Sequence, residues 1–459
     1  MAHRKGKKVP AQLVEDEDYQ LRHEKVAGID IAKDKGDVCT RLPPAAGGRR
    51  RRSRVEQDVP ARSADILELG ARLLADGVEL VVMESTSDYW RIWYYLLESA
   101  GLAVALVNSS HARQLAGRPK TDALDCQWLA RLAEMGLLRP SFVPPPEIRA
   151  LRDLTRARAH LVRDRTRAWQ RLEKLLEGAL IKLSSELSSL ARVKTARLIL
   201  DALAGGERDP RALAGLALGP LRARRGELER SLEGMMIGDH HARLIRIHLD
   251  QVDLLDRSAA AVQDEIDAAL AAVSAAWGVT AAGEPSPDPG PGALLPPADA
   301  RLAEVDGVTL DLARAVIAEI GLDMSAFRTA RQLVSWAGLA PVARQSGPRR
   351  GKPRKGQGNA YIKNLCTQAA NGAGKTDSFL GERFRRLART IGPARAKVAV
   401  ARSILVIIWH LLADPAARYT DLGPDWHDRK TSRDKKIRGH LRSLQALGID
   451  TSSLIATAG

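Results

Sequence analysis

Short apolar runs separated by helical patterns characterise the first part of the chain. The segments with strand character are residues 26–31, 36–42, 78–83 and 102–107. Between them, residues 61–75 and 88–100 repeat apolar side chains every three or four positions, as an amphipathic helix does. This order, a strand hairpin followed by alternating helices and strands, predicts an α/β layer with a mostly parallel sheet over residues 25–140.

The segments beside these elements lack their periodicity. Residues 1–24 mix basic and acidic clusters, which predicts a flexible arm. Residues 49–54 are almost entirely arginine and predict a solvated loop.

Helical patterns dominate residues 145–276. Leucines recur at three-four spacing from Leu151 to Leu175, and a longer seam from Ile245 to Val273 has the alternation of a coiled coil. The sequence leaves two partners open for this seam, namely the earlier helix in an antiparallel hairpin or another subunit.

Proline and glycine concentrate in residues 277–299, which predicts a linker before a further domain at residues 300–425. That domain contains helical patterns at residues 359–370 and 394–413. The second includes an apolar run that is short and interrupted by His410, so it predicts a buried helix and no membrane partner. Residues 426–459 form a basic tail without a clear pattern.

The charge balance points to a polyanionic partner. Lysine and arginine number 71 against 55 acids, a net charge of +16, which favours nucleic acid through phosphate neutralisation. A membrane surface fits less well, because the basic residues do not follow one apolar helix. The cysteines Cys39, Cys126 and Cys366 stand singly and indicate a reducing compartment. Residues 1–24 lack a signal-peptide run, so we expect a soluble, cytoplasmic protein.

Four acids fall at predicted strand ends and in the helix that follows the third strand: Asp30, Glu84, Asp122 and Asp125. Asp122 and Asp125 are three positions apart, so in a helix both carboxylates project from one face. Such a pair is usually relieved by a basic side chain or a divalent metal ion. Each acid alone also has a structural interpretation, as a capped or solvated side chain, but their convergence on one layer favours a metal site.

These residues carry a resemblance to a known family. The segments 28–30 (GID), 83–86 (MEST) and 120–125 (KTDALD) resemble the DEDD transposases of bacterial insertion sequences, the "IS one-ten" type. The resemblance covers roughly the first 135 residues and implies an α/β ribonuclease H-like (RuvC-like) N-terminal domain. It implies that the four acids bind Mg²⁺ or Mn²⁺, and Arg118 and Lys120 are candidate phosphate contacts beside them.

The resemblance resumes after the linker. Residues 302–320 look like a helix-hairpin-helix, with Thr309 where that motif usually has its second glycine. Residues 333–347 are similar to the mostly α C-terminal domain of the same transposases, in which a serine before glycine is the proposed nucleophile. The resemblance therefore implies that Ser346 is the nucleophile, with Ser335 as the weaker candidate. Residues 1–24 and 178–235 are additions to the usual family length.

The loop around Ser346 is strongly basic. Glycine and proline interrupt it, so a flexible loop that follows a nucleic-acid strand fits better than a helix. Its candidate nucleic-acid-binding residues are Arg344, Arg349, Arg350, Lys352, Arg354 and Lys355. Four further arginines, at 383, 385, 386 and 389, add a second basic face.

A recombinase benefits from having both the metal-binding acids and a nucleophilic serine. Two metal ions about 3.5–4 Å apart can offset charge on the attacking and leaving oxygens of a phosphodiester. A serine ester would conserve the bond energy that hydrolysis discards. The prediction is a DNA transposase that excises and inserts its own element, in the bacterial cytoplasm at the nucleoid. The resemblance also implies a structured guide RNA, and the separation of acids and serine suggests a homo-oligomer, a dimer or tetramer.

Two other functions stay open on the sequence. A RuvC-like metal-dependent nuclease or junction resolvase would use the acids and water, with Ser346 as a turn residue. A non-enzymatic nucleic-acid-binding protein or repressor would use the acids only structurally.

Overall fold

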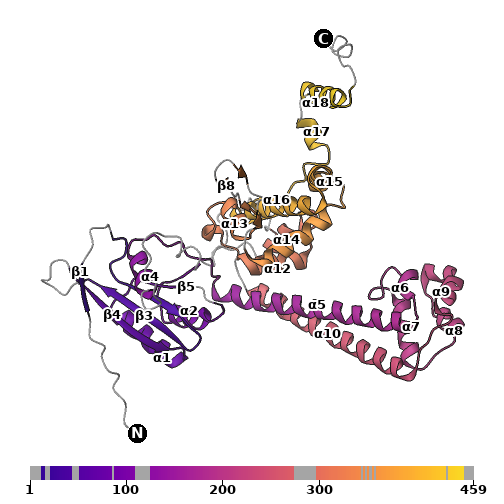
Figure 1. Ribbon diagram of the computed structural model, residues 1–459, viewed down its shortest axis with the longest axis horizontal. Helices are drawn as coiled ribbons and strands as arrows, with labels where there is room; N and C mark the ends of the chain where they lie inside the picture. The colour runs from indigo at the N-terminus through magenta and orange to yellow at the C-terminus, as the bar shows by residue number, and fades with distance from the viewer. Residues whose placement is uncertain are drawn as a thin grey trace, which may run out of the picture. The chain divides into compact units, whose positions relative to one another are not determined.

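The computed structural model divides the chain into two compact units, residues 1–143 and 144–459 (Figure 1). The residues it describes are 12–15, 21–43, 51–84, 87–108, 125–272, 296–342, 345–346, 349–350, 354–355, 358–430 and 433–448.

The first unit is built on a six-stranded mixed sheet in the order β1-β4-β3-β2-β5-β6. Its strands are β1 (Gln12–Glu15), β2 (Val26–Ile31), β3 (Lys35–Leu42), β4 (Arg51–Pro60), β5 (Leu80–Glu84) and β6 (Val104–Val107). The strands β2, β5 and β6 run parallel, whereas β1, β4, β3 and β2 pair antiparallel. The expected mostly parallel sheet is therefore wrong, because a meander of short connections supplies half of the layer.

The strand β4 replaces part of the loop expected at residues 49–54. Arg54 of this strand has two side-chain partners: its Nε lies 2.9 Å from Glu56 Oε1, and its Nη1 donates to Gln127 Oε1 at 3.1 Å. Within the segment expected to be a flexible arm, β1 pairs with β4. Neither strand has the apolar alternation by which a half-buried strand is recognised.

Helices cover both faces of the sheet, and alternate strand residues serve the two sides. On one face, α1 (Ser63–Ala75) and α2 (Trp90–Ser99) pack over Ile29 and Met83. On the other, α4 (Asp125–Glu134) packs over Val26 and Val82.

Two long helices, α5 (Pro146–Gly178) and α10 (Asp239–Ala272), lie side by side in the second unit (Figure 1). The end of α5 shares an apolar cluster with the start of α10, and Arg165 forms an ion pair with Asp256 farther along. The helices are therefore antiparallel, and the seam finds its partner within the chain.

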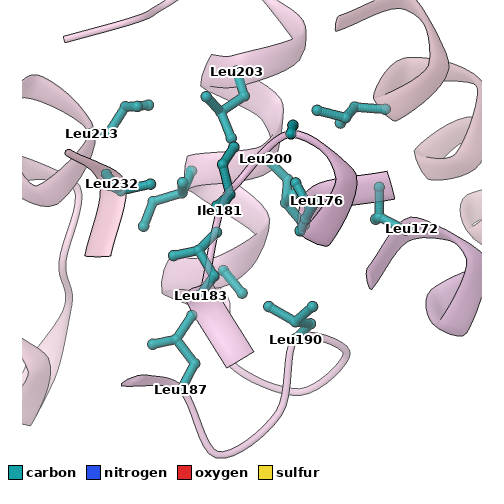
Figure 2. Packing of buried hydrophobic residues seen from close by; sticks show 14 of the residues in the cluster. Leu172, Leu176, Ile181, Leu183, Leu187, Leu190, Leu200, Leu203, Leu213 and Leu232 are labelled. Atoms are coloured by element: carbon teal, nitrogen blue, oxygen red, sulfur yellow. The ribbon is translucent and has the colours of Figure 1, made fainter. Parts of the chain in front are cut away.

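A small helical cap with its own core connects these two helices. It comprises α6 (Leu183–Glu186), α7 (Lys194–Ala204), α8 (Pro210–Gly215), the 3-10 helix η2 (Gly219–Arg224) and α9 (Arg225–Leu232). Figure 2 shows its leucine-rich core, to which Leu172 and Leu176 of α5 contribute. Arg197 of α7 donates to both carboxylate oxygens of Asp253 on α10, at 2.6 and 2.7 Å. Residues 178–235, expected to be an addition to the usual family length, thus include a structured cap at the tip of the hairpin.

The rest of the second unit is mostly helical. Its elements are α11 (Ala298–Ala303), α12 (Leu310–Ile320), the 3-10 helix η4 (Met324–Ala326), α13 (Ala330–Trp336), β7 (Pro341–Val342), β8 (Gln345–Ser346), β9 (Arg349–Arg350), β10 (Arg354–Lys355), α14 (Ala360–Ala373), α15 (Phe379–Ile391), α16 (Pro393–Ala413), α17 (Trp426–Lys430) and α18 (Arg433–Ala446). The tail expected at residues 426–459 thus includes two helices. α16 is long and apolar enough to cross a membrane, but it packs against α11, α13, α14 and α15 as a core helix does.

The hairpin between α11 and α12 has the helical pair expected for residues 302–320. Gly307 adopts a φ of +82°, and a Cβ there would lie 2.1 Å from the Ala369 carbonyl oxygen of α14. Thr309 caps α12 by accepting a hydrogen bond from the Leu312 amide at 3.3 Å. The hairpin glycine therefore serves close packing between helices.

Candidate metal and nucleic-acid sites

Asp30 and Glu84 lie at the carboxyl ends of neighbouring parallel strands. The register pairs Ile29 with Met83, and each acid follows one residue later. Side chains alternate between the two faces of a sheet along each strand. Asp30 lies four residues after Val26, and Glu84 two residues after Val82, so both carboxylates point to the face that α4 covers. Glu84 is buried, with 7% of its surface exposed, and Asp30 is partly buried.

The helix α4 begins at this same end of the strands. A Cβ on Gly28 would lie 2.3 Å from the Cys126 carbonyl oxygen, so the first turn of α4 touches β2 two residues before Asp30. The last residue of α4, Glu134, forms a buried ion pair with Arg41 at 2.8 Å, and Arg41 lies opposite Val26 at the start of β2. The helix thus runs antiparallel to β2, which places Asp125 at the edge that Asp30 occupies.

The structure therefore brings Asp30, Glu84 and Asp125 to one face and one edge of the sheet. Their donors are carboxylate oxygens, which suit Mg²⁺ or Mn²⁺. Within the described ranges, no three histidine, cysteine, aspartate or glutamate side chains come close enough to hold one metal ion. The fourth acid, Asp122, and the candidate phosphate contacts Arg118 and Lys120 lie outside the described residues.

Two acids that the sequence did not single out extend this edge. Asp37 on β3 is the direct partner of Asp30, and Asp58 on β4 is the partner of Asp37. Lys35 Nζ lies 3.0 Å from Asp37 Oδ1 and 2.9 Å from Asp58 Oδ2. Burial and the neighbouring Asp58 raise the pKa of Asp37, whereas the hydrogen bond from Lys35 lowers the pKa of Asp58. Their alignment depends on the register of β4, which the sequence pattern did not reveal.

The serine loop, residues 341–357, contains two nested antiparallel pairs. β7 pairs with β10 on the outside, and β8 pairs with β9 inside, so that Ser346 lies opposite Arg349. These short strands were not expected from the sequence. The side chains of this loop lie outside the described part of the structure, as do Arg344 and Lys352 altogether. Ser335 lies on α13 and is exposed.

Both ends of the serine loop are held close together. A Cβ on Gly358 would lie 2.3 Å from the Gly338 amide nitrogen, so the lack of a side chain at Gly358 permits this close backbone contact. Asn359 then caps α14, accepting from the Tyr361 amide at 2.9 Å.

A buried carboxylate joins this loop end to the long helix α5. Glu319 on α12 is 1% exposed, and it accepts from Arg156 Nε and Nη2 at 2.7 and 2.9 Å. The Asn359 side-chain amide donates to Glu319 Oε2 at 2.6 Å. Arg156 also lies over the ring of Tyr361, 4.2 Å from its centroid. No local sequence pattern predicts this network, because its members are distant along the chain.

Comparison with known families gives two matches. Residues 27–181 match a family model described as a DEDD transposase of the IS110 type. Residues 299–380 match a model described as "Transposase IS116/IS110/IS902 family". Together the models cover about half of the chain, including the acidic edge and the serine loop. No curated protein matches the chain.

Proposed function

Because the chain belongs to the IS110-type DEDD transposases, and is thus an enzyme of DNA transposition, we propose that it excises and inserts an insertion sequence by metal-assisted strand cleavage and serine-linked rejoining. The observation that carries this proposal is the placement of Asp30, Glu84 and Asp125 on one edge of the α4-covered face. Three antiparallel strands, β4, β3 and β2, followed by two parallel ones support a ribonuclease H-like (RuvC-like) assignment for this domain.

The four acids of the family motif, Asp30, Glu84, Asp122 and Asp125, would hold Mg²⁺ or Mn²⁺. A bound divalent cation would supply charge stabilisation at the scissile phosphate. The partial burial of the three described acids keeps water from solvating them fully, which increases their attraction for a cation.

Ser346 would be the attacking group. Its Oγ–phosphorus bond forms as the bond from phosphorus to the leaving sugar oxygen breaks. The hydroxyl proton passes to solvent, and the sugar oxygen gains a proton. Rejoining runs the same exchange in reverse with a new sugar hydroxyl, so no bond energy is lost to hydrolysis. The loop's six basic residues, from Arg344 to Lys355, would hold the neighbouring phosphates.

The proposal includes three further expectations from the family. A structured guide RNA would pair with donor and target DNA, and the net charge of +16 suits binding to both nucleic acids. The acids and the serine lie in different units of the chain, which favours assembly of the reaction site in a homo-oligomer, a dimer or tetramer. The protein would act in the bacterial cytoplasm at the nucleoid.

The test is to trap a covalent protein–DNA adduct on supercoiled DNA that carries the element ends, with the guide RNA and Mg²⁺ present. We expect Ser346→Ala to abolish the adduct and Ser335→Ala, the matched control, to retain it. Mutation of residues that only support metal ligands typically lowers metal affinity or activity about 10–100-fold. Glu84→Gln and Asp125→Asn, which change the ligands themselves, should therefore lower cleavage by more than about 100-fold. Chelation of the metal with EDTA should do the same.

An adduct that still forms with Ser346→Ala would exclude this serine as the nucleophile. Cleavage to free ends at the full wild-type rate in that variant would favour the RuvC-like nuclease or resolvase instead. Undiminished activity in Asp122→Asn and Asp125→Asn would contradict the metal site.

A further inference from the structure

A hollow of about 1170 Å³ lies among α14, α15 and α16 beside the start of the serine loop. It is slightly larger than the pockets of about 300–1,000 Å³ that typically hold small molecules. Gly338, Leu339 and Ala340, the residues that lead directly into β7, line one side. Val406 and Ile407 of α16 add apolar side chains to the lining.

Cationic side chains also line the hollow. The lining includes Lys363 from α14, Arg383 from α15, and Arg395, Lys397 and Arg402 from α16, and among the described residues it includes no aspartate or glutamate. Within the described part of the chain, none of the five forms an ion pair. The contrast on α15 is direct: Arg385 and Arg389 both pair with Glu382, at 3.2 and 3.7 Å, whereas Arg383 faces the hollow.

Arg383 is the least compensated of these cations. Its Nε is buried and finds no hydrogen-bond partner among the described residues. Burial, followed by the nearby Arg386 and Arg402, lowers the pKa of its guanidinium. A buried cation near like charges destabilises the fold unless an anion occupies the site. The arrangement therefore favours an anionic ligand with an apolar portion.

We propose that this hollow binds an unpaired nucleotide segment, with phosphates against its cationic side chains and a base against its apolar ones. Single-stranded sites typically combine a basic groove with a surface against which exposed bases pack. The bases of a duplex are stacked inside and cannot enter a concave site. The hollow adjoins the root of the serine loop, so it would hold a single-stranded segment next to that loop. This inference rests on the proposed function, in which the chain acts on nucleic acid.

The test compares binding of labelled oligothymidylate with binding of a labelled duplex by the full-length protein. The pocket variants are Arg383→Gln and Arg402→Gln, singly and together. The matched controls are Arg385→Gln and Arg389→Gln, which remove the same charge from α15. A third pocket variant, Ser403→Glu, adds a carboxylate to the lining and keeps every arginine.

Each pocket variant should weaken oligothymidylate binding by about 10-fold or more, the worth of one charged hydrogen bond. The slope of log K against log salt should fall by about 0.7 for each phosphate that the variant no longer neutralises. The controls should change binding little, and duplex affinity should change equally in pocket and control variants. Arg383→Gln should leave the melting temperature unchanged or raise it, because it removes a half-buried cation that lacks an acidic partner among the described residues.

Equal losses in the pocket and control variants would overturn the inference, since they would reflect net charge alone. A selective loss of duplex binding would also overturn it. A changed oligomeric mass in light scattering, with oligothymidylate binding intact, would assign the hollow to a second copy of the chain. If the protein forms the Ser346 adduct but Arg383→Gln leaves oligothymidylate binding unchanged, this inference alone is refuted. If the protein binds neither oligothymidylate nor duplex, the proposed function is refuted as well.

Discussion

Gly28 shows how one residue sets the geometry of the acidic edge. Its position beneath α4 leaves no room for a side chain, because a Cβ would meet Cys126 O at 2.3 Å and Ala130 N at 2.6 Å. Both contacts are to backbone atoms, which cannot move aside as a flexible side chain does. The close approach holds the first turn of α4, and Asp125 with it, against the strand that carries Asp30.

We therefore predict that Gly28→Ala destabilises the first unit by about 1–3 kcal/mol, the usual cost of overpacking. Denaturant unfolding followed by tryptophan fluorescence measures this change. The control is Gly226→Ala in α9, where a Cβ meets nothing within 4 Å and alanine favours the helix. Equal stability of Gly28→Ala and wild type would mean that α4 does not lie against β2 in this way.

The junction of α5 and α12 combines a buried ion pair and an exposed one at the scale of elements. Glu319 is enclosed with Arg152, Arg156 and Asn359. Asp311, on the same helix α12, pairs with Arg158 at 2.8 Å with 53% of its side chain exposed. Removing one partner of a buried ion pair costs more stability than removing one of an exposed pair, because water solvates the remaining charges only in part.

We expect Glu319→Gln to destabilise the second unit by about 3–5 kcal/mol, since it leaves two enclosed guanidinium groups without their carboxylate. Asp311→Asn, the matched control at the same junction, should change stability by no more than about 1 kcal/mol. Thermal unfolding of the two variants measures the difference. Comparable effects of the two substitutions would contradict the described burial of Glu319.

At the scale of the whole molecule, the chain contains two units with separate cores. The sheet and its helices supply the first core, and the cap of the α5–α10 hairpin forms a core of the second. The acidic edge belongs to the first unit and the serine loop to the second.

Calorimetry should accordingly show two unfolding transitions, because each core can melt by itself. Gly28→Ala should shift one transition and Glu319→Gln the other. If both substitutions moved the same transition, the units would unfold as one cooperative body.

The sequence alone determined the elements with strong periodicity and the residues that carry the family motif. The strands at 26–31 and 78–83 and the helix at 394–413 followed from local apolar patterns, which depend on neighbours along the chain. Asp30 and Glu84 were identifiable because they interrupt or close apolar segments, and Asp125 because of its helical spacing from Asp122. Their roles as ligands, and that of Ser346 as nucleophile, stay predictions.

Only the tertiary structure decided which segments meet. β4 is rich in arginine and lacks the alternation of a half-buried strand, so its pairing with β3, and with it the alignment of Asp58, appeared only in the sheet. The choice of α5 as the partner of α10, the enclosure of Glu319 and the exposure of Arg383 to an apolar hollow likewise join residues distant in sequence. Such contacts depend on long-range packing, which local patterns do not encode.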